Sequence, residues 1–374
     1  MKKRVLGLLL CAVMVLAMLA GCSNSGDSKT TTAAKEETKA TETTAAKETQ
    51  AAATEAKKQS GVVTNDIDMT KYEKGKVVRV WLPIPQDNDY QKITDVKYDA
   101  GDAKAEEATD DQGNKMLYIE WGKDADPASR KATLSFHAER TEVVRPELKE
   151  EGTVGSDMDE YLKGSAMVKV DDPEVQKLAK EITDGKDAVV DKARAIYDWI
   201  YDNMNRDNSV TGCGDGDICR LLAEGVRAGK CTDINSVFVG LCRASGIPAR
   251  EMFGIRINAD DITKNQHCWA EFYVPGTGWV GADPADVLKF VLNADGEPYD
   301  KASAEALEKK EYYWGNTDEK RVELTHGRDL TLSPAQAGEA LNDFGYPYAE
   351  VDDEVIDYYT PDAFVYTYSF AEDK

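Results

Sequence analysis

The sequence predicts an α+β protein, because two kinds of hydrophobic pattern follow one another along its 374 residues. Between about residues 62 and 145, apolar and polar residues alternate in short segments, as in strands with one buried face. From about residue 170, apolar residues recur every three or four positions, as in amphipathic helices, and strand-like segments return after residue 250. Helices followed by strands are typical of an α+β domain, and the short strands before them predict a small β-sandwich.

The predicted strands of residues 62–145 are separated by turn residues. Residues 77–82 form a β-branched run that ends at Pro83, while residues 115–121 and 132–139 alternate between apolar and polar side chains. The Asp, Asn and Gly residues between such segments favour tight turns. We therefore expect residues 62–145 to form a β-sandwich-like domain.

The helices are predicted within residues 146–300, which we expect to be the core domain. Asp172 and Pro173 are typical of the cap and the first position of a helix. A second helix is predicted from Asp187, and a third over residues 231–245.

Strands are predicted after these helices, at residues 250–257, 268–274 and 279–282. Residues 301–374 begin with a charged helical stretch and end in an aromatic segment. Because this C-terminal extension is too apolar for an unfolded tail, we expect it to pack on the core.

The N-terminus resembles the signal peptide of a bacterial lipoprotein. Basic residues 2–4 precede an apolar run over residues 5–20, which is too short for a comfortable membrane span. The run ends in the sequence LAGC, which resembles a lipobox and implies removal of residues 1–21 and a lipid on Cys22. An ordinary secretory signal that happens to contain a cysteine is the alternative.

Residues 22–61 are predicted to be a disordered tether, since after Cys22 they hold no aromatic or branched aliphatic residue that could be buried. The expected protein is therefore held at the extracellular face of the cell membrane by its lipid. Its formal charge of −23 repels phosphate backbones, so nucleic acid is excluded as an expected partner.

The cysteines do not predict a disulfide scaffold or a metal site. Cys213 and Cys219 are close enough in sequence for a disulfide in an exported protein, but the spacing does not require one. The oxidation state of Cys242 and Cys268 is equally open. A zinc site using Cys231, His267 and Cys268 is disfavoured because adjacent strand residues such as His267 and Cys268 point to opposite faces. No metal or cofactor is predicted.

Three residues in separate segments predict thiol chemistry. Cys231 lies at the start of a predicted helix, where the helix dipole and free backbone N–H groups favour a thiolate. His267 precedes one predicted strand and Asp283 ends the next, an even number of residues apart with Pro275 midway. If a hairpin is centred there, the two face each other, so the carboxylate orients the imidazole and the imidazolium stabilises the thiolate. A Cys–His–Asp triad for acyl transfer is the resulting hypothesis.

The motifs around these residues resemble the transglutaminase-like superfamily. They read GKCTD at 229–233, LCRASGIPAR at 241–250, QHCWAEFY at 266–273 and GWVGADPAD at 278–286. The resemblance implies a papain-like α+β fold, with Cys231 as nucleophile, His267 as general base and acid, and Asp283 as the orienting residue.

The resemblance leaves the reaction open. It implies that a protein or peptide amide forms a thioester with the cysteine. Either water or an amine then takes the acyl group from this thioester. The backbone N–H of Cys231 is the expected first oxyanion donor, and the second is unassigned. The alternative is a catalytically silent surface module that uses the same fold to bind cell-wall or protein partners.

Overall fold

The computed structural model describes residues 55–145, 147–223, 225–292, 300–360 and 362–374. The expected signal peptide, the expected lipidation site Cys22 and most of the expected tether lie outside the described residues. Within the described part, no helix is long and apolar enough to cross a bilayer.

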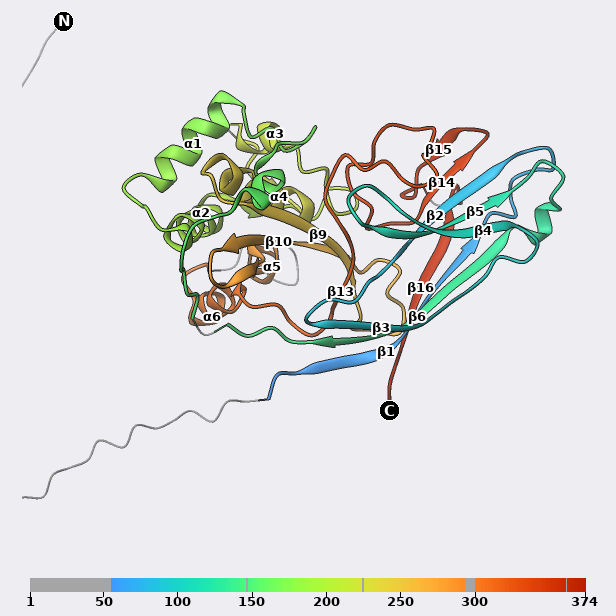
Figure 1. Cartoon of the computed structure of the whole chain (residues 1–374), viewed down its shortest axis with the longest axis horizontal. Coiled ribbons are helices and arrows are strands. Elements are labelled where there is room, and N and C mark those ends of the chain that lie inside the picture. The colour runs from blue at the N-terminus through green and yellow to red at the C-terminus, as the bar shows by residue number, and fades with distance from the viewer. Residues whose placement is uncertain (1–54, 146, 224, 293–299, 361) are drawn as a thin grey trace, which may run out of the picture. The chain divides into compact units, whose positions relative to one another are not determined.

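Helices pack on a five-stranded antiparallel sheet, here called the core sheet, and two further antiparallel sheets lie beside this unit (Figure 1). The helices are α1 (Pro173–Thr183), α2 (Val189–Asn203), α3 (Ile218–Leu222), α4 (Cys231–Ala244), α5 (Pro284–Phe290) and α6 (Ala304–Tyr312). Short 3-10 turns occur at Pro127–Ser129 and Ser156–Leu162. The α+β class predicted from the sequence is confirmed.

The core sheet has the strand order β12-β11-β10-β9-β13. Its strands are β9 (Ala249–Arg256), β10 (Gln266–Val274), β11 (Gly278–Ala282), β12 (Trp314–Gly315) and β13 (Arg321–His326). A parallel pair of two-residue strands, β7 (Asn205–Arg206) and β8 (Ala228–Gly229), precedes α4. The predicted helices and strands of residues 172–282 are present, with ends that differ by one or two residues.

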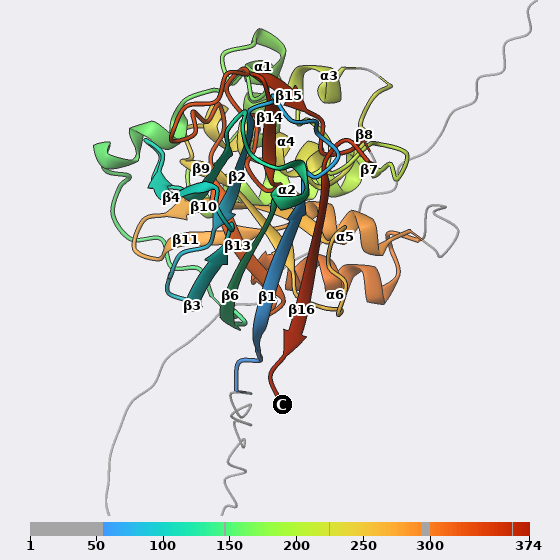
Figure 2. The same cartoon turned by 90° about the vertical axis from the view of Figure 1, so that its right-hand side faces the viewer.

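The other two sheets pack face to face as a sandwich (Figure 2). The first, in the order β16-β1-β6-β3, contains β1 (Lys58–Asp68), β3 (Gln91–Asp99), β6 (Lys131–Thr141) and β16 (Val365–Glu372). The second, in the order β15-β14-β2-β5-β4, contains β2 (Val78–Ile84), β4 (Lys104–Thr109), β5 (Lys115–Trp121), β14 (Tyr348–Val351) and β15 (Glu354–Ile356). Ile67 and Leu134 of the first sheet share one buried cluster with Leu82 and Ile119 of the second.

The segments assigned to the sandwich differ from the expected ones at both ends of the chain. β1 begins at Lys58, inside the expected tether of residues 22–61. The C-terminal extension does more than pack on the core: β12 and β13 join the core sheet, while β14, β15 and β16 complete the two sandwich sheets. β16 lies antiparallel to β1, with Phe370 opposite Val63 (Figure 2).

Candidate functional site

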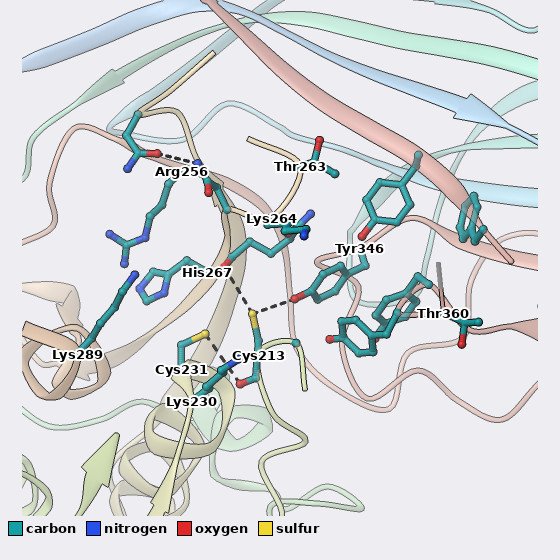
Figure 3. A pocket seen from close by; sticks show the side chains of 18 of the residues that line it. Cys213, Lys230, Cys231, Arg256, Thr263, Lys264, His267, Lys289, Tyr346 and Thr360 are labelled. Carbon is teal, nitrogen blue, oxygen red and sulfur yellow. Dashed lines mark hydrogen bonds between the residues drawn. The ribbon is translucent and has the colours of Figure 1, made fainter. Parts of the chain in front are cut away.

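Cys231 is the first residue of α4 and lies at a cavity of about 600 Å³ (Figure 3). Only 4% of the residue is exposed. The extended backbone of Lys230 ends a strand-like segment directly before the helix, and its N–H donates to the Asp233 carboxylate at 2.9 Å. This contact fixes the first turn of α4 and leaves the sulfur at the positive end of the helix dipole.

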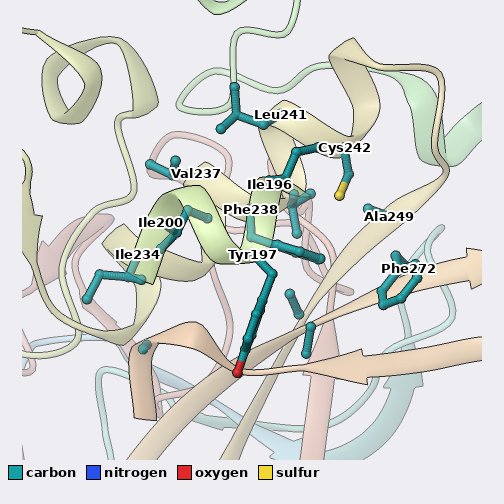
Figure 4. Close-up of a cluster of buried hydrophobic side chains, with 14 of the residues drawn as sticks. Ile196, Tyr197, Ile200, Ile234, Val237, Phe238, Leu241, Cys242, Ala249 and Phe272 are labelled. Carbon is teal, nitrogen blue, oxygen red and sulfur yellow. The ribbon is translucent and has the colours of Figure 1, made fainter. Parts of the chain in front are cut away.

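The helix that carries Cys231 is buried along most of its length (Figure 4). Val237 and Phe238 of α4 belong to the same buried cluster as Ile196 and Tyr197 of α2, and Phe272 of β10 closes the other side. Phe238 contacts Tyr197 and Phe272 edge-on, with ring centroids 6.4 Å and 5.9 Å away. A close-packed helix resists rotation, so the position of the sulfur is set by the core.

His267 and Asp283 are brought together by the β10–β11 hairpin, although the expected register was wrong. Val274 pairs with Gly278, so the hairpin is centred on Gly276 and not on Pro275. Gly276 has φ 86°, a conformation that L-residues rarely adopt, and this places the turn there. The next pair in this register is Trp269 with Asp283. Because Trp269 is two residues from His267, Asp283 and His267 lie on the same face of the sheet.

A short contact joins the two side chains. His267 Nε2 lies 2.7 Å from Asp283 Oδ2, and both residues are buried. The carboxylate can only accept, so it selects the tautomer with the proton on Nε2 and leaves Nδ1 for another partner. Cys231 and His267 line the same cavity, so the structure brings the three predicted residues into one site.

The surroundings of Cys231 favour its ionised form. Hydrogen bonds from the Cys213 and Cys268 thiols, and then from His267, hold the pKa of Cys231 well below its usual range, although burial opposes them. The contact with Cys231 and then burial raise the pKa of Cys213, while burial and then the contact with Cys231 raise the pKa of Cys268. Of the three thiols, Cys231 is therefore the one whose ionisation the surroundings favour.

The surroundings of His267 favour its protonated form. Burial and the nearby charge of Arg256 lower its pKa, but the carboxylates of Asp283 and Asp286 outweigh both and leave the pKa raised. A thiol with a lowered pKa beside an imidazole with a raised pKa favours a thiolate–imidazolium pair near neutral pH.

Arg321 is a site residue that sequence reasoning missed. Its guanidinium is 1% exposed, contacts Asp283 through Nη1, and donates to Asp286 at 2.8 Å and Asp318 at 2.8 Å. Arg256 also pairs with Asp286, at 2.6 Å. No motif marked Arg321, which lies 38 residues after Asp283 in a different strand.

His267, Asp283 and Asp286 are close enough to one another to be considered as metal ligands, since their ligand atoms lie within 4.8 Å. However, the two carboxylates already bind the guanidinium of Arg321, and Asp286 binds that of Arg256 as well. These fixed cations supply the positive charge that a metal ion would bring, so the donor set does not fit a metal.

Asn235, one turn after Cys231, fixes the position of Asp283. Its Nδ2 donates to the carbonyl oxygen of Cys268 at 2.9 Å and to Asp283 Oδ1 at 3.3 Å. The carboxylate is thus bound from α4, from β10 and from β13. The sequence shows that Cys231 and Asn235 are four residues apart and so lie on one helix face. It does not show that the Asn235 side chain bonds Asp283.

The described cysteines are all free thiols, so the structure holds no Cys213–Cys219 disulfide. Cys213 Sγ instead lies 3.0 Å from the hydroxyl of Tyr346 and lines the cavity with Cys231. Cys219 lies in α3, at a different cavity.

Residues 176–284, which include the three predicted site residues, match the sequence profile of the transglutaminase-like superfamily. An uncharacterized protein from Haemophilus influenzae is 36% identical over 336 residues, which cover 82% of this chain and 89% of that protein. The uncharacterized protein YebA from Bacillus subtilis is 29% identical over 125 residues, 29% of this chain and 17% of YebA.

Three solved structures are similar at lower identity. A protein from Cytophaga hutchinsonii, proposed to be a cysteine protease, is 19% identical with a TM-score of 0.49, covering 85% of this chain and 99% of that one. The periplasmic domain of TgpA from Pseudomonas aeruginosa is 13% identical with a TM-score of 0.34, covering 62% and 93%. Red sea bream transglutaminase is 15% identical with a TM-score of 0.26, covering 59% and 46%.

The resemblance that the motifs of residues 229–286 suggested is thus supported by a family match over the same segment and by a relative aligned over most of both chains. The chain belongs to the transglutaminase-like superfamily.

Proposed function

We propose that the protein is a thiol enzyme that attacks protein or peptide amides through a thioester on Cys231. His267 is the general base and acid, and Asp283 orients it. The observation that carries this proposal is the 2.7 Å contact between His267 and buried Asp283 at a cavity whose wall holds the sulfur at the start of α4. Thiolate, ring and carboxylate in this order match the arrangement used for nucleophilic catalysis.

In the first half of the reaction, the thiolate of Cys231 attacks the amide carbonyl carbon and forms a C–S bond. Protonated His267 donates its proton to the leaving nitrogen as the C–N bond breaks, which releases an amine and leaves a thioester. In the second half, neutral His267 takes a proton from water or from an incoming amine, which attacks the thioester carbon. The C–S bond then breaks and returns the thiolate and the imidazolium.

Two donors are available for the oxyanion that forms at each attack. The backbone N–H of Cys231 belongs to the first turn of α4, where N–H groups have no partner within the helix. Gln266 lines the same cavity, and among the described residues its buried Nε2 has no hydrogen-bond partner. We assign Gln266 as the second donor.

The proposed location is the extracellular face of the cell membrane, with the lipid on Cys22 as the anchor. Supporting this are the basic start, the apolar run and the LAGC sequence before residue 23.

Hydrolysis and transfer share the thioester and differ in the acceptor. A glutamine-rich protein incubated with a labelled primary amine separates them, because only transfer leaves the amine covalently attached.

Alkylation by iodoacetamide across a pH series, with the modified cysteine identified by mass spectrometry, tests the proposal. We expect Cys231 to react selectively and fast well below pH ~8, the range in which an ordinary thiol is protonated. In His267→Ala the pH midpoint should rise, because the imidazolium no longer stabilises the thiolate. Half-buried Cys219 is the internal control, since burial and nearby carboxylates raise the pKa of its thiol. Reaction of Cys231 no faster than that of Cys219 would support a silent binding module instead.

A further inference from the structure

The cavity in front of Cys231 has basic side chains in its wall and no acidic ones among the described residues. The basic residues are Arg206, Lys230, Arg256, Lys264 and Lys289. The whole chain has 69 acidic and 46 basic residues, so a wall of average composition would carry more acid than base. The site therefore has the opposite charge from the molecule around it.

Among the described residues, one of these five charges forms a direct ion pair, although the carboxylates of Asp207 and Asp261 act on Arg206, Lys230 and Lys264 from further away. Arg256 pairs with Asp286 at 2.6 Å. For the other four, no described residue places a carboxylate oxygen within 4.0 Å. The guanidinium of Arg206 bonds only a neutral amide, that of Asn208, at 3.0 Å. Lys264 and Lys289 are exposed at the rim, so their ammonium groups can move toward a ligand.

Buried carboxyl groups near the sulfur do not face this cavity. Asp343 lines a small recess behind the thiol together with Cys213 and Cys268, and burial raises the pKa of its carboxyl group. Asp283 and Asp286 are bound by Arg321 beneath the histidine. The described residues that line the cavity therefore contribute positive charge, which the carboxylates of Asp207 and Asp261 outside the wall reduce in part.

The opposite wall is aromatic and comes from the C-terminal extension. Tyr346 stacks on Tyr358 with ring centroids 4.6 Å apart, and Tyr359 meets Tyr358 edge-on at 4.4 Å. In Figure 3, Arg256 and Lys289 lie on the His267 side of the thiol and Tyr346 on the other. A substrate at the sulfur thus meets cations on one side and aromatic rings on the other.

From this arrangement we propose that the site selects peptides that carry a carboxylate close to the amide to be attacked. The proposal rests on the proposed thiol function and names its substrate class. The carboxylate bonds the ammonium group of Lys264 or of Lys289 at the rim, and the tyrosine wall receives an apolar neighbour. A cavity of about 600 Å³ is of the size that holds a bound peptide segment or small ligand.

Internally quenched peptides of Gly and Ala test the proposal, with a single Glu, Gln or Lys moved along otherwise identical chains. We expect kcat/KM for Glu to exceed that for Gln by about tenfold at one position or more, and the advantage to shrink as salt is raised from ~0.01 M to ~1 M. Each peptide is prepared with a free and an amidated C-terminus. A side-chain carboxylate is the source if the preference for Glu is the same in free and amidated peptides. The terminal carboxylate is a second source if amidation lowers kcat/KM of the Glu, Gln and Lys peptides alike.

The double variant Lys264→Glu/Lys289→Glu tests the residues. Both side chains are exposed, so folding should be little affected, and the preference should shift from the Glu toward the Lys peptide. Lys177→Glu/Lys180→Glu is the matched control, because it makes the same change in charge on two exposed residues of α1, which contributes nothing to the cavity. It should retain the wild-type preference.

Binding to Cys231→Ala, measured by calorimetry, separates the substrate class from the chemistry. Salt-sensitive binding of the Glu peptide without turnover by the wild type would overturn the thiol function and leave the ligand class standing. Equal kcat/KM for the Glu, Gln and Lys peptides, or no preferential binding of the Glu peptide to Cys231→Ala, overturns the proposed selectivity.

Discussion

Arg321 is the residue on which the buried charges of the site converge. One guanidinium contacts the carboxylates of Asp283, Asp286 and Asp318, and it approaches His267 Nε2 to 3.2 Å. Because that nitrogen already points its proton at Asp283, the two nitrogens share an acceptor and do not bond each other. The planar fork of arginine suits this role, since a lysine offers a single point charge.

Replacing Arg321 by Met should lower the free energy of unfolding by about 3–5 kcal/mol, because buried carboxylates lose their partner. The alkylation rate of Cys231 at neutral pH should fall as well, since Asp283 is no longer held against His267. Urea unfolding followed by tryptophan fluorescence measures the first effect, and the pH series with iodoacetamide measures the second.

Lys320→Met provides the control for Arg321, because Lys320 is the exposed neighbour and loses the same charge. It should leave both measurements close to those of the wild type. Equal effects of the two substitutions would mean that Arg321 acts only through the net charge of the chain. In Arg321→Lys, a smaller loss than in Arg321→Met is expected, since one charge remains.

At the scale of single elements, the start of α4 depends on the fit between Asp233 and the glycines around it. The Asp233 carboxylate accepts from the N–H groups of Lys230 at 2.9 Å and Gly216 at 3.0 Å. A Cβ on Gly229 would lie 2.4 Å from the Asp233 Cβ, and one on Gly214 would lie 2.0 Å from its carboxylate. The helix start therefore requires two positions without side chains.

Gly229→Ala should displace Asp233 and shift the first turn of α4, which carries the sulfur. We expect a loss of about 1–3 kcal/mol in the free energy of unfolding and slower alkylation of Cys231. Gly122→Ala is the matched control, because a Cβ there meets nothing within 4 Å. Unchanged reactivity of Cys231 in Gly229→Ala would show that the helix start tolerates the displacement.

Elements were predictable from the sequence where the signal is local. Asp172 caps α1 and Pro173 is its first residue, as expected, because capping depends on neighbouring residues. The register of the β10–β11 hairpin was not, since the φ of 86° at Gly276 moves the turn by one residue. His267 and Asp283 still lie on the same face of the sheet. Moving the turn by one residue shifts the strand pairing by two residues, and a shift of two leaves each side chain on its original face.

At the scale of the whole molecule, the C-terminal extension joins parts that the sequence separates. It supplies Arg321 to the site, the tyrosine wall to the cavity, and β14, β15 and β16 to the sandwich sheets. The pairing of Gly61 with Glu372 links opposite ends of the described chain. Such partners cannot be read from a single sequence, because alternation shows that a strand has a buried face but not which strand lies beside it.

Glu323 of β13 lies where the core sheet meets the sandwich. Asn88 Nδ2 donates to its carboxylate at 2.8 Å, and Gln91 Oε1 accepts from its backbone N–H at 2.8 Å. Burial and the like charge of Glu271 raise the pKa of Glu323 to about 7, although Arg250 and Arg140 oppose them. The carboxyl group is 24% exposed, which moderates the energetic consequence.

The pKa of Glu323 predicts how stability depends on pH. Its ordinary value is 4.5, so between pH 4.5 and about 7 the folded chain keeps a proton that the unfolded chain has released. The contribution of this group to stability therefore falls as pH rises through that window, by on the order of 2 kcal/mol. Glu323→Gln cannot titrate and should match the wild type below pH 4.5 but be more stable above pH 7. Urea unfolding across this range measures the difference, with the exposed Glu354→Gln as the charge-matched control. If the free energy of unfolding changes with pH in parallel for wild type and Glu323→Gln, the carboxyl group ionises normally. The contact between core and sandwich would then not depend on its protonation.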